Sequence, residues 1–201
     1  MSVPTMARQA RIERKTKETQ VIAELGIDGT GLSTIATPIP FFTHMLEAWS
    51  KHGMMDLSLE AHGDVEVDIH HTVEDVGIVL GQAFKQALGD KRGITRFGHA
   101  FVPMDEALLF SAVDLSGRPF LVFDVPVART RVSNFDLDML PEFWRAFAFN
   151  AEITLHVRMH TGHNLHHITE AVFKSAGRAL AAATRLDPRI PGQLPSTKGT
   201  L

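Results

Sequence analysis

The chain has 201 residues, of which 44% are hydrophobic and 21% are charged, values typical of a globular protein with one domain or two smaller ones. A formal net charge of −3 gives no electrostatic reason to expect nucleic acid or an anionic membrane as a partner, and no run approaches the ~20 apolar residues of a membrane helix. Because the chain contains no Cys, a bound metal would have to use His and carboxylate ligands, and we expect a cytoplasmic protein without disulfides.

In chain order, residues 1–10 predict a loose tail, and the alternation of apolar and polar residues that follows predicts strands. A turn at residues 28–31 should fold the second strand back beside the first as a hairpin, which Pro38 and Pro40 end. The predicted elements of this half are strands over 21–27 and 32–37, a helix over 41–51, a strand over 57–61 and a helix over 72–88.

The second half repeats this plan, again with a turn between its first two strands. Its predicted elements are strands over 107–115 and 120–125, a helix over 140–150, a strand over 153–159 and a helix over 168–184. Each half therefore reads β-β-α-β-α, which predicts an α+β fold with helices covering one face of the sheet in each half-domain. We expect the first half to span 11–95, the second half 96–186 and a C-terminal tail 187–201.

A His-His-x-x-Glu cluster occurs twice in register. The two copies are His70-His71-Thr72-Val73-Glu74 and His166-His167-Ile168-Thr169-Glu170. On a helix, the first His and the Glu of each copy lie at i and i+4 on one face. The second His lies about 100° round the helix and points to a neighbouring site. One cluster can therefore serve two metal ions, or one metal ion from each side.

The helix before each cluster carries one more candidate ligand at an equivalent position, His44 in the first half and Glu142 in the second. We interpret the chain as an internal duplication. His156 is a rival to Glu142 as a ligand, but Ser58 takes its place in the first half. We therefore expect His156 to support a metal ligand through a hydrogen bond or to have a structural role. The candidate metal ligands are His44, His70, His71, Glu74, Glu142, His166, His167 and Glu170.

Eight such ligands divide into two four-ligand sites for Mn²⁺, Fe²⁺ or Zn²⁺, each with positions left open for substrate or water. Pseudo-symmetry suggests that each site takes His from both clusters. The expected sets are His44, His71, His166 and Glu170 for one metal, and His70, Glu74, Glu142 and His167 for the other. The alternative is that the His pairs of the two clusters are surface residues or polar groups at helix starts. The repetition of the cluster in register disfavours this alternative. The expected bystanders are His62, His99, His160 and His163.

With both clusters identified, the chain resembles the imidazoleglycerol-phosphate dehydratase family of histidine biosynthesis from Arg11 to Leu201. The stretches that carry the resemblance follow one another in order along the chain. They are residues 16–19, 39–46, 52–53, 68–75, 93–98, 104–108, 114–119, 154–156, 166–171 and 195–199. So many motifs in the right order are far more specific than one short pattern.

The resemblance implies a duplicated fold like that of ribosomal protein S5 domain 2, two Mn²⁺ per active site, and a homo-oligomer of twenty-four subunits with sites at subunit interfaces. It implies dehydration of D-erythro-imidazole glycerol phosphate to imidazole acetol phosphate through a metal-bound, imidazolate- or diazafulvene-like intermediate. The partners would be this small phosphorylated substrate and copies of the same chain, with no nucleic acid and no membrane.

The resemblance also implies roles for residues that are not metal ligands. Glu18 and His52 would act on the substrate's hydroxyls and in proton transfer, although alone they look like an exposed strand carboxylate and a helix-end imidazole. The phosphate would need fixed cations and hydrogen-bond donors. The implied substrate- and phosphate-binding residues are Arg96, Arg118, Ser196, Thr197 and Lys198.

The chain departs from the family pattern at three places. The family often has His at Glu142, Asp at Thr43 and Asn at Val73. Since a carboxylate can replace imidazole on Mn²⁺, we expect Glu142 to alter metal affinity more than function. Two other functions remain open, a dinuclear metallohydrolase that needs no phosphate-binding tail and a structural particle whose metal ions only join subunits.

Overall fold

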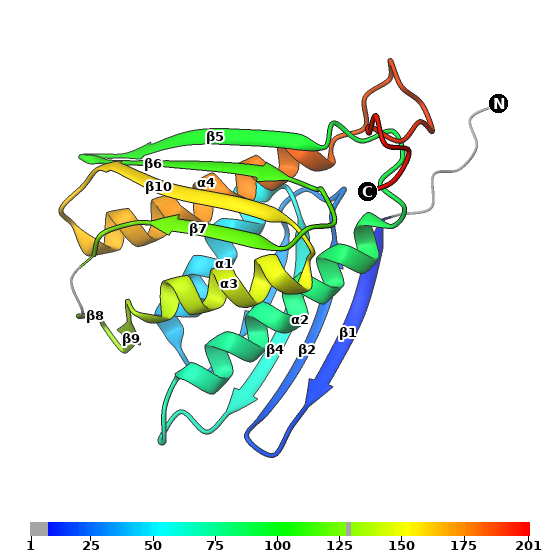
Figure 1. The fold of residues 1–201 in the computed structure, drawn as a ribbon. Coiled ribbons are helices and arrows are strands. Elements are labelled where there is room, and N and C mark those ends of the chain that lie inside the picture. Colours follow the sequence, from blue (N-terminus) through cyan, green and yellow to red (C-terminus); the bar gives the residue numbers. More distant parts are fainter. Residues whose placement is uncertain (1–7, 128–129) are drawn as a thin grey trace.

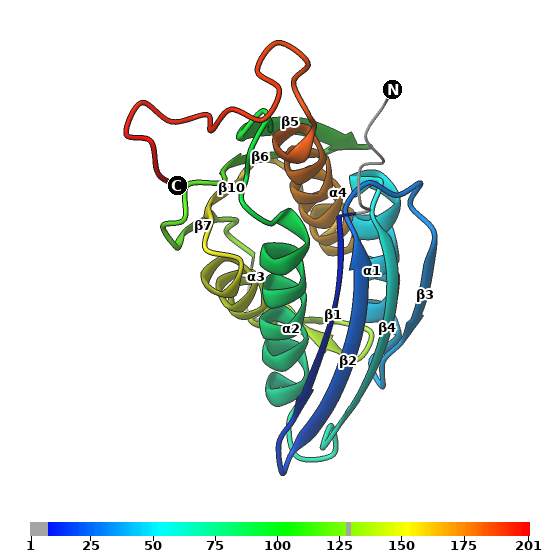
Figure 2. The same cartoon turned by 90° about the vertical axis from the view of Figure 1, so that its right-hand side faces the viewer.

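The computed structural model describes residues 8–127 and 130–201, so most of the expected N-terminal tail lies outside the described residues. Two four-stranded sheets enclose a layer of four long helices, as Figures 1 and 2 show. The first half consists of β1 (Gln9–Lys15), β2 (Thr19–Gly26), β3 (Ser33–Ala36), α1 (Pro40–Gly53), β4 (Asp56–Gly63) and α2 (His70–Leu88).

The second half has the same order of elements, with one short hairpin added. It consists of β5 (Phe97–Met104), β6 (Ala107–Asp114), β7 (Phe120–Asp124), β8 (Arg131–Val132), β9 (Phe135–Asp136), α3 (Met139–Asn150), β10 (Thr154–Thr161) and α4 (Leu165–Thr184). The duplicated α+β fold predicted from the sequence is confirmed, and helices cover the inner face of each sheet. Within the described residues, no helix is long and apolar enough to cross a membrane.

Each half begins with a strand that the sequence prediction did not include, β1 in one half and β5 in the other. Both are edge strands, in sheets of order β1-β2-β4-β3 and β5-β6-β10-β7. In β1 only the Ala10 side chain is buried, because solvent reaches the rest of this edge. An edge strand needs little apolar alternation, and β5 even contains Pro103, so neither has the pattern of a central strand.

The predicted pairing of the second and third strands as a hairpin is wrong in both halves. β3 pairs in parallel with β4, and β7 in parallel with β10, so a third strand separates each expected pair. The cause is the helix that follows. α1 carries the chain back over the sheet, as a parallel connection requires, and β4 then enters between β3 and β2.

The two halves pack helix against helix, α1 on α4 and α2 on α3, at equivalent glycines. A Cβ added to Gly177 of α4 would lie 2.7 Å from the carbonyl oxygen of Trp49 on α1. A Cβ added to Gly81 of α2 would lie 2.6 Å from the carbonyl oxygen of Phe147 on α3. Only a residue without Cβ permits these approaches. The glycines therefore determine how closely the ligand-bearing helices lie.

Candidate metal centre

Three of the predicted metal ligands meet where α1 crosses the beginning of α4. The Nε2 atoms of His44 and His166 lie 3.3 and 3.1 Å from the same oxygen, Oε2 of Glu170. The ligand atoms of these three residues lie within 4.8 Å of one another, and among the described residues no other set of three does so. We call His44, His166 and Glu170 the first ligand group.

Local structure explains how α4 presents its cluster. The side chain of Asn164 accepts hydrogen bonds from the backbone N–H groups of His166 and His167, which starts the helix at the two histidines. One turn later, Glu170 lies over His166 on the same face. The close packing at Gly177 then brings His44 of α1 to both of them.

Lys174 lies beside this group and was not among the predicted site residues. Its Nζ donates a hydrogen bond to Oε1 of Glu170 at 2.6 Å, which leaves Oε2 facing the two histidines. Burial raises the pKa of Glu170, but the hydrogen bond and the charge of Lys174 outweigh this and keep the pKa below its usual value. The i, i+4 spacing of Glu170 and Lys174 was the available signal.

The equivalent residues of the other half are not gathered in the same way. His70 and Glu74 of α2 lie 3.8 Å apart, Nε2 to Oε2. Glu142 of α3 instead forms an ion pair with Arg145 on its own helix. Since α2 packs on α3 as α4 packs on α1, these residues occupy pseudo-symmetric positions around the second helix pair. We call His70, Glu74 and Glu142 the second ligand group.

The second His of each cluster faces a carboxylate that is not among the predicted ligands. Nδ1 of His71 donates to Asp64, with 3.1 and 3.2 Å to its two oxygens, and this hydrogen bond is the main reason that the pKa of His71 is raised. Nδ1 of His167 donates to Oε2 of Glu106 at 2.8 Å. The hydrogen bond from His167, followed by that from the backbone N–H of Asn164, lowers the pKa of Glu106 from 4.5 to about 2. His71 and His167 therefore stand outside the two groups of their own chain.

The two residues implied in proton transfer lie near different clusters. Glu18 stands in the turn between β1 and β2, with its Oε2 3.9 Å from Nδ1 of His71 and its side chain 57% exposed. His52 lies in the last turn of α1, where burial, then the charges of Lys174 and Arg178, lower its pKa. A lowered pKa keeps this imidazole neutral and able to accept a proton near pH 7.

The turn that carries Glu18 is fixed to α2. Oγ1 of Thr16 accepts a hydrogen bond from the backbone N–H of Glu18 at 3.1 Å, and the hydroxyl of Thr16 contacts that of Thr19. The hydroxyl of Thr19 donates to the buried Asp75, which directly follows the first cluster, and Arg14 pairs with the other oxygen of Asp75 at 2.8 Å. The position of Glu18 is thus tied to the helix that carries His71.

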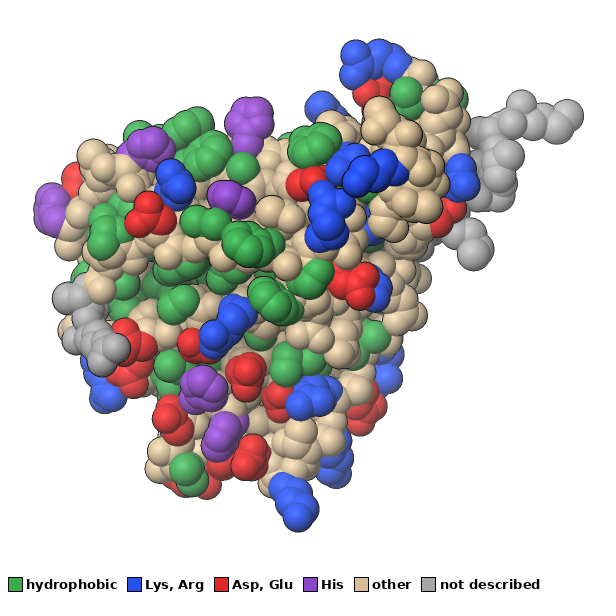
Figure 3. Space-filling view, in the orientation of Figure 1, with side chains coloured by type: hydrophobic (Ala, Val, Ile, Leu, Met, Phe, Trp, Pro, Cys, Tyr) green, Lys and Arg blue, Asp and Glu red, His purple; other side chains and the backbone are tan. Residues whose placement is uncertain are grey.

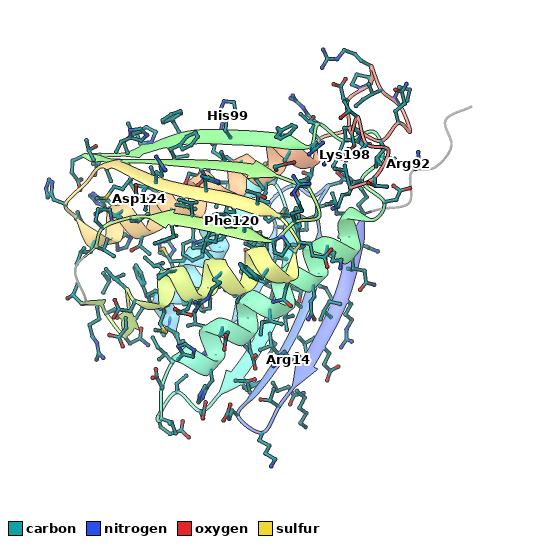
Figure 4. The ribbon with its side chains drawn as sticks, viewed as in Figure 1. Arg14, Arg92, His99, Phe120, Asp124 and Lys198 are labelled. Carbon is teal, nitrogen blue, oxygen red and sulfur yellow. The ribbon has the colours of Figure 1, made fainter. Side chains whose placement is uncertain are left out.

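The predicted phosphate-binding residues gather at the other end of the molecule. Arg96 pairs with Asp114 at 2.8 Å and donates to the carbonyl oxygen of Pro195, so it connects β6 to the C-terminal segment. Arg118 is exposed and lies 3.7 Å from Asp114. The same segment carries the predicted Ser196, Thr197 and Lys198, near which Lys and Arg side chains are concentrated in Figures 3 and 4.

This basic end lies far from the first ligand group. The backbone N–H of Arg96 donates to the carbonyl oxygen of Ala183 in the last turn of α4, whereas His166 lies in the first turn. At ~1.5 Å per residue, the helix from His166 to Ala183 spans roughly 25 Å. In Figure 3, by contrast, His and acidic side chains gather around the beginning of α2. One chain therefore holds the first ligand group and the basic cluster at opposite ends of α4.

Comparison with known proteins identifies the family. The family model described as imidazoleglycerol-phosphate dehydratase matches residues 37–180. The chain is 56% identical over 195 residues to the imidazoleglycerol-phosphate dehydratase of Gluconacetobacter diazotrophicus, covering 97% of this chain and 98% of that protein. The chain belongs to the imidazoleglycerol-phosphate dehydratase family. The dehydratase of Acetivibrio thermocellus is also 56% identical, over 98% of this chain and 100% of that protein.

Solved structures of the family have the same fold. The dehydratase of Staphylococcus aureus matches with a TM-score of 0.81 and 36% identity, over 89% of this chain and 99% of that chain. The Pyrococcus furiosus enzyme, solved in complex with (S)-C348, also matches with a TM-score of 0.81 and 36% identity, over 94% and 100%. The family, the fold and the enzyme class, a hydro-lyase, that the sequence predicted are thereby confirmed.

Two of the three departures from the family pattern lie away from the ligand atoms. Val73 is fully buried in the hydrophobic core, and Thr43 bonds through its hydroxyl to Thr37 at 2.9 Å. Glu142 differs, because it stands at a predicted ligand position and already has a cationic partner in Arg145. Asp64 and Glu106, like Lys174, were missed as contributors to the site. The contact of Glu106 with His167 joins residues 61 positions apart, and that of Asp64 with His71 crosses the loop between β4 and α2, so neither follows from the spacing of residues on one helix.

Proposed function

We propose that this chain catalyses the Mn²⁺-dependent dehydration of D-erythro-imidazole glycerol phosphate to imidazole acetol phosphate, a step of L-histidine biosynthesis in the cytoplasm. The observation that carries the proposal is the first ligand group, His44, His166 and Glu170, in a chain more than half identical to dehydratases of that name. Two imidazoles and a carboxylate suit Mn²⁺ and leave coordination positions free. The donor set therefore fits the metal.

Each proposed ligand set combines one ligand group with the second His of the other cluster. His71 would complete the first ligand group, and His167 would complete the second, each from a neighbouring subunit. Support comes from the hydrogen bonds of both histidines, which use Nδ1 and leave Nε2 for a metal. When bound, the metal ions would supply Lewis acidity that orients the imidazole ring of the substrate and lowers its pKa.

The distance along α4 also supports active sites shared between subunits. Three carbons between an imidazole and a phosphate make a substrate on the order of 10 Å long, since single bonds measure about 1.5 Å. It cannot bridge the roughly 25 Å that separates His166 from the end of α4 near Arg96. The phosphate would therefore bind to another copy of the chain. We propose a homo-oligomer, with twenty-four subunits as the number that the family resemblance implies.

The proposed roles of the remaining residues follow from their surroundings. Glu18 is exposed and tied to α2, so it can meet the substrate's hydroxyls next to His71. His52, neutral near pH 7, can accept a proton beside Lys174. Arg96 and Arg118 would bind the phosphate through their guanidinium forks, helped by donors of the C-terminal segment. Those proposed donors are Ser196, Thr197 and Lys198.

Identification of the product tests this function. Purified protein loaded with Mn²⁺ should convert imidazole glycerol phosphate into imidazole acetol phosphate, with loss of one water molecule measured by mass spectrometry. Release of inorganic phosphate instead would contradict the proposal and support a metallohydrolase. Protein that binds Mn²⁺, assembles and leaves the substrate unchanged would support a structural role for the metal.

A further inference from the structure

The duplication places a carboxylate on Nδ1 of the second His of each cluster, but the two carboxylates come from different places. In the second half the partner of His167 is Glu106, in the turn between β5 and β6. In the first half the partner of His71 is Asp64, which directly follows β4. The residue equivalent to Glu106 is not Asp64. It is Glu18, because each of these glutamates directly precedes the second strand of its half.

Glu106 is fully engaged as the partner of His167. Besides the hydrogen bond from Nδ1, its Oε1 accepts the backbone N–H groups of His163 and Asn164 at 3.2 and 2.8 Å. Three donors hold a side chain that is only 27% exposed. A glutamate held in this way cannot reach a substrate.

Glu18 stands in the corresponding place without that engagement. In Figure 1 the turn between β1 and β2 lies beside the beginning of α2, and Oε2 of Glu18 is 3.9 Å from Nδ1 of His71, beyond a normal hydrogen bond. Asp64 occupies Nδ1 with both oxygens. Asp68 also faces His71, but its Oδ1 accepts the backbone N–H of His70 at 3.0 Å. Glu18 is therefore the carboxylate that would take over Nδ1 if Asp64 were removed.

We propose that Asp64 is a positioning residue that orients His71 through Nδ1 and thereby frees Glu18, whose counterpart Glu106 is bound to His167, to act on the substrate. The inference rests on the proposed function for the role of Glu18. It explains how a duplicated chain has one glutamate available for chemistry and one that is not. Fixing Nδ1 directs Nε2 of His71 outward, where a metal can bind it.

The test compares Asp64→Ala with the matched variant Glu106→Ala in the full-length enzyme. For each, calorimetry measures Mn²⁺ affinity, and steady-state kinetics with imidazole glycerol phosphate measure kcat at saturating Mn²⁺. Glu106→Ala leaves Nδ1 of His167 without its carboxylate and should weaken Mn²⁺ binding by about 10- to 100-fold. Asp64→Ala should weaken it less, because Glu18 takes the place of Asp64 on His71. With Mn²⁺ saturating, Glu106→Ala should recover kcat. Asp64→Ala should not, because Glu18 would then pair with His71.

A third variant separates positioning from folding. In Asp64→Asn the amide oxygen still accepts the hydrogen bond from Nδ1, so kcat at saturating Mn²⁺ should return to the wild-type value. Full recovery of kcat in Asp64→Ala would contradict the proposal that Asp64 keeps Glu18 available for the substrate. Mn²⁺ affinity that stays unchanged in Asp64→Ala and also when Glu18 is replaced by Ala as well would overturn the positioning role. A wild-type protein without dehydratase activity would refute the proposed function, while the affinity measurement would still decide whether Asp64 orients His71.

Discussion

At the scale of single residues, the site depends on carboxylates that hold histidines as much as on the histidines. Glu170 receives Lys174 on one oxygen and faces His44 and His166 with the other. Glu106 accepts a hydrogen bond from Nδ1 of His167, and the hydrogen bonds to its charged form lower its pKa to about 2. A carboxylate whose charged form is stabilised in this way makes the stability of the fold depend on pH.

The lowered pKa of Glu106 predicts a loss of stability in acid. A carboxyl with a folded-state pKa below its unfolded value of 4.5 stabilises the fold above that pH, and the contribution disappears as the pH falls toward about 2. In metal-free protein, Glu106→Gln should lower the melting temperature at pH 7 and much less at pH 2.5. Glu66→Gln, on the exposed loop before α2, is the control and should change little at either pH. An equal effect of Glu106→Gln at both pH values would contradict this account.

At the scale of elements, packing of the helices decides which ligands meet. Alternation and helical spacing in the sequence were enough to predict helices, strands and the repeated cluster, because these signals are local. Pairing of β3 with β4 rather than β2 was not predictable from them, since it depends on the path of α1 over the sheet. Contacts such as that of His71 with Asp64 depend in turn on where β4 ends. The sequence thus indicated candidate ligands, three of which the fold gathers, but not the carboxylates Asp64 and Glu106 that hold two of the histidines.

The glycine contact between α1 and α4 is open to a direct test. In Gly177→Ala the new Cβ would press on the carbonyl oxygen of Trp49, so we expect destabilisation by about 1–3 kcal/mol and weaker Mn²⁺ binding as His44 moves from His166. Denaturant unfolding and calorimetry measure the two effects.

Gly81→Ala is the matched control, because it forces apart α2 and α3 at the carbonyl oxygen of Phe147. We expect similar destabilisation, with the metal affinity of the first ligand group preserved. If both variants weakened that affinity equally, the glycine contact would have no specific effect on the first ligand group.

At the scale of the whole molecule, the duplication places candidate ligands at equivalent positions of two helix pairs. Those of the first ligand group are gathered and those of the second are not, and neither group includes the second His of a cluster. His71 and His167 point to carboxylates of their own chain, while the basic cluster of Arg96 and Arg118 lies at the far end of α4. The candidate metal ligands and the proposed phosphate-binding residues of a single copy therefore lie apart. This arrangement is the physical reason to expect shared sites.

Subunit mixing tests shared sites. His71→Ala and Arg118→Ala should each be nearly inactive alone. After joint unfolding and refolding as a random 1:1 mixture, on the order of a quarter of the sites should combine intact parts from different subunits and regain activity. Mixing two samples of the same variant is the control. A mixture as inactive as its components would mean that His71 and Arg118 of one site come from the same chain.

The most direct test of the central claim is the dehydration rate measured against bound Mn²⁺ per chain, from fully chelated to saturated protein. Chelation should abolish formation of imidazole acetol phosphate, and activity should return with added Mn²⁺ and level off near two ions per chain, as the two ligand groups predict. Undiminished dehydration by protein freed of metal, or saturation with Mn²⁺ without any dehydration, would contradict the account.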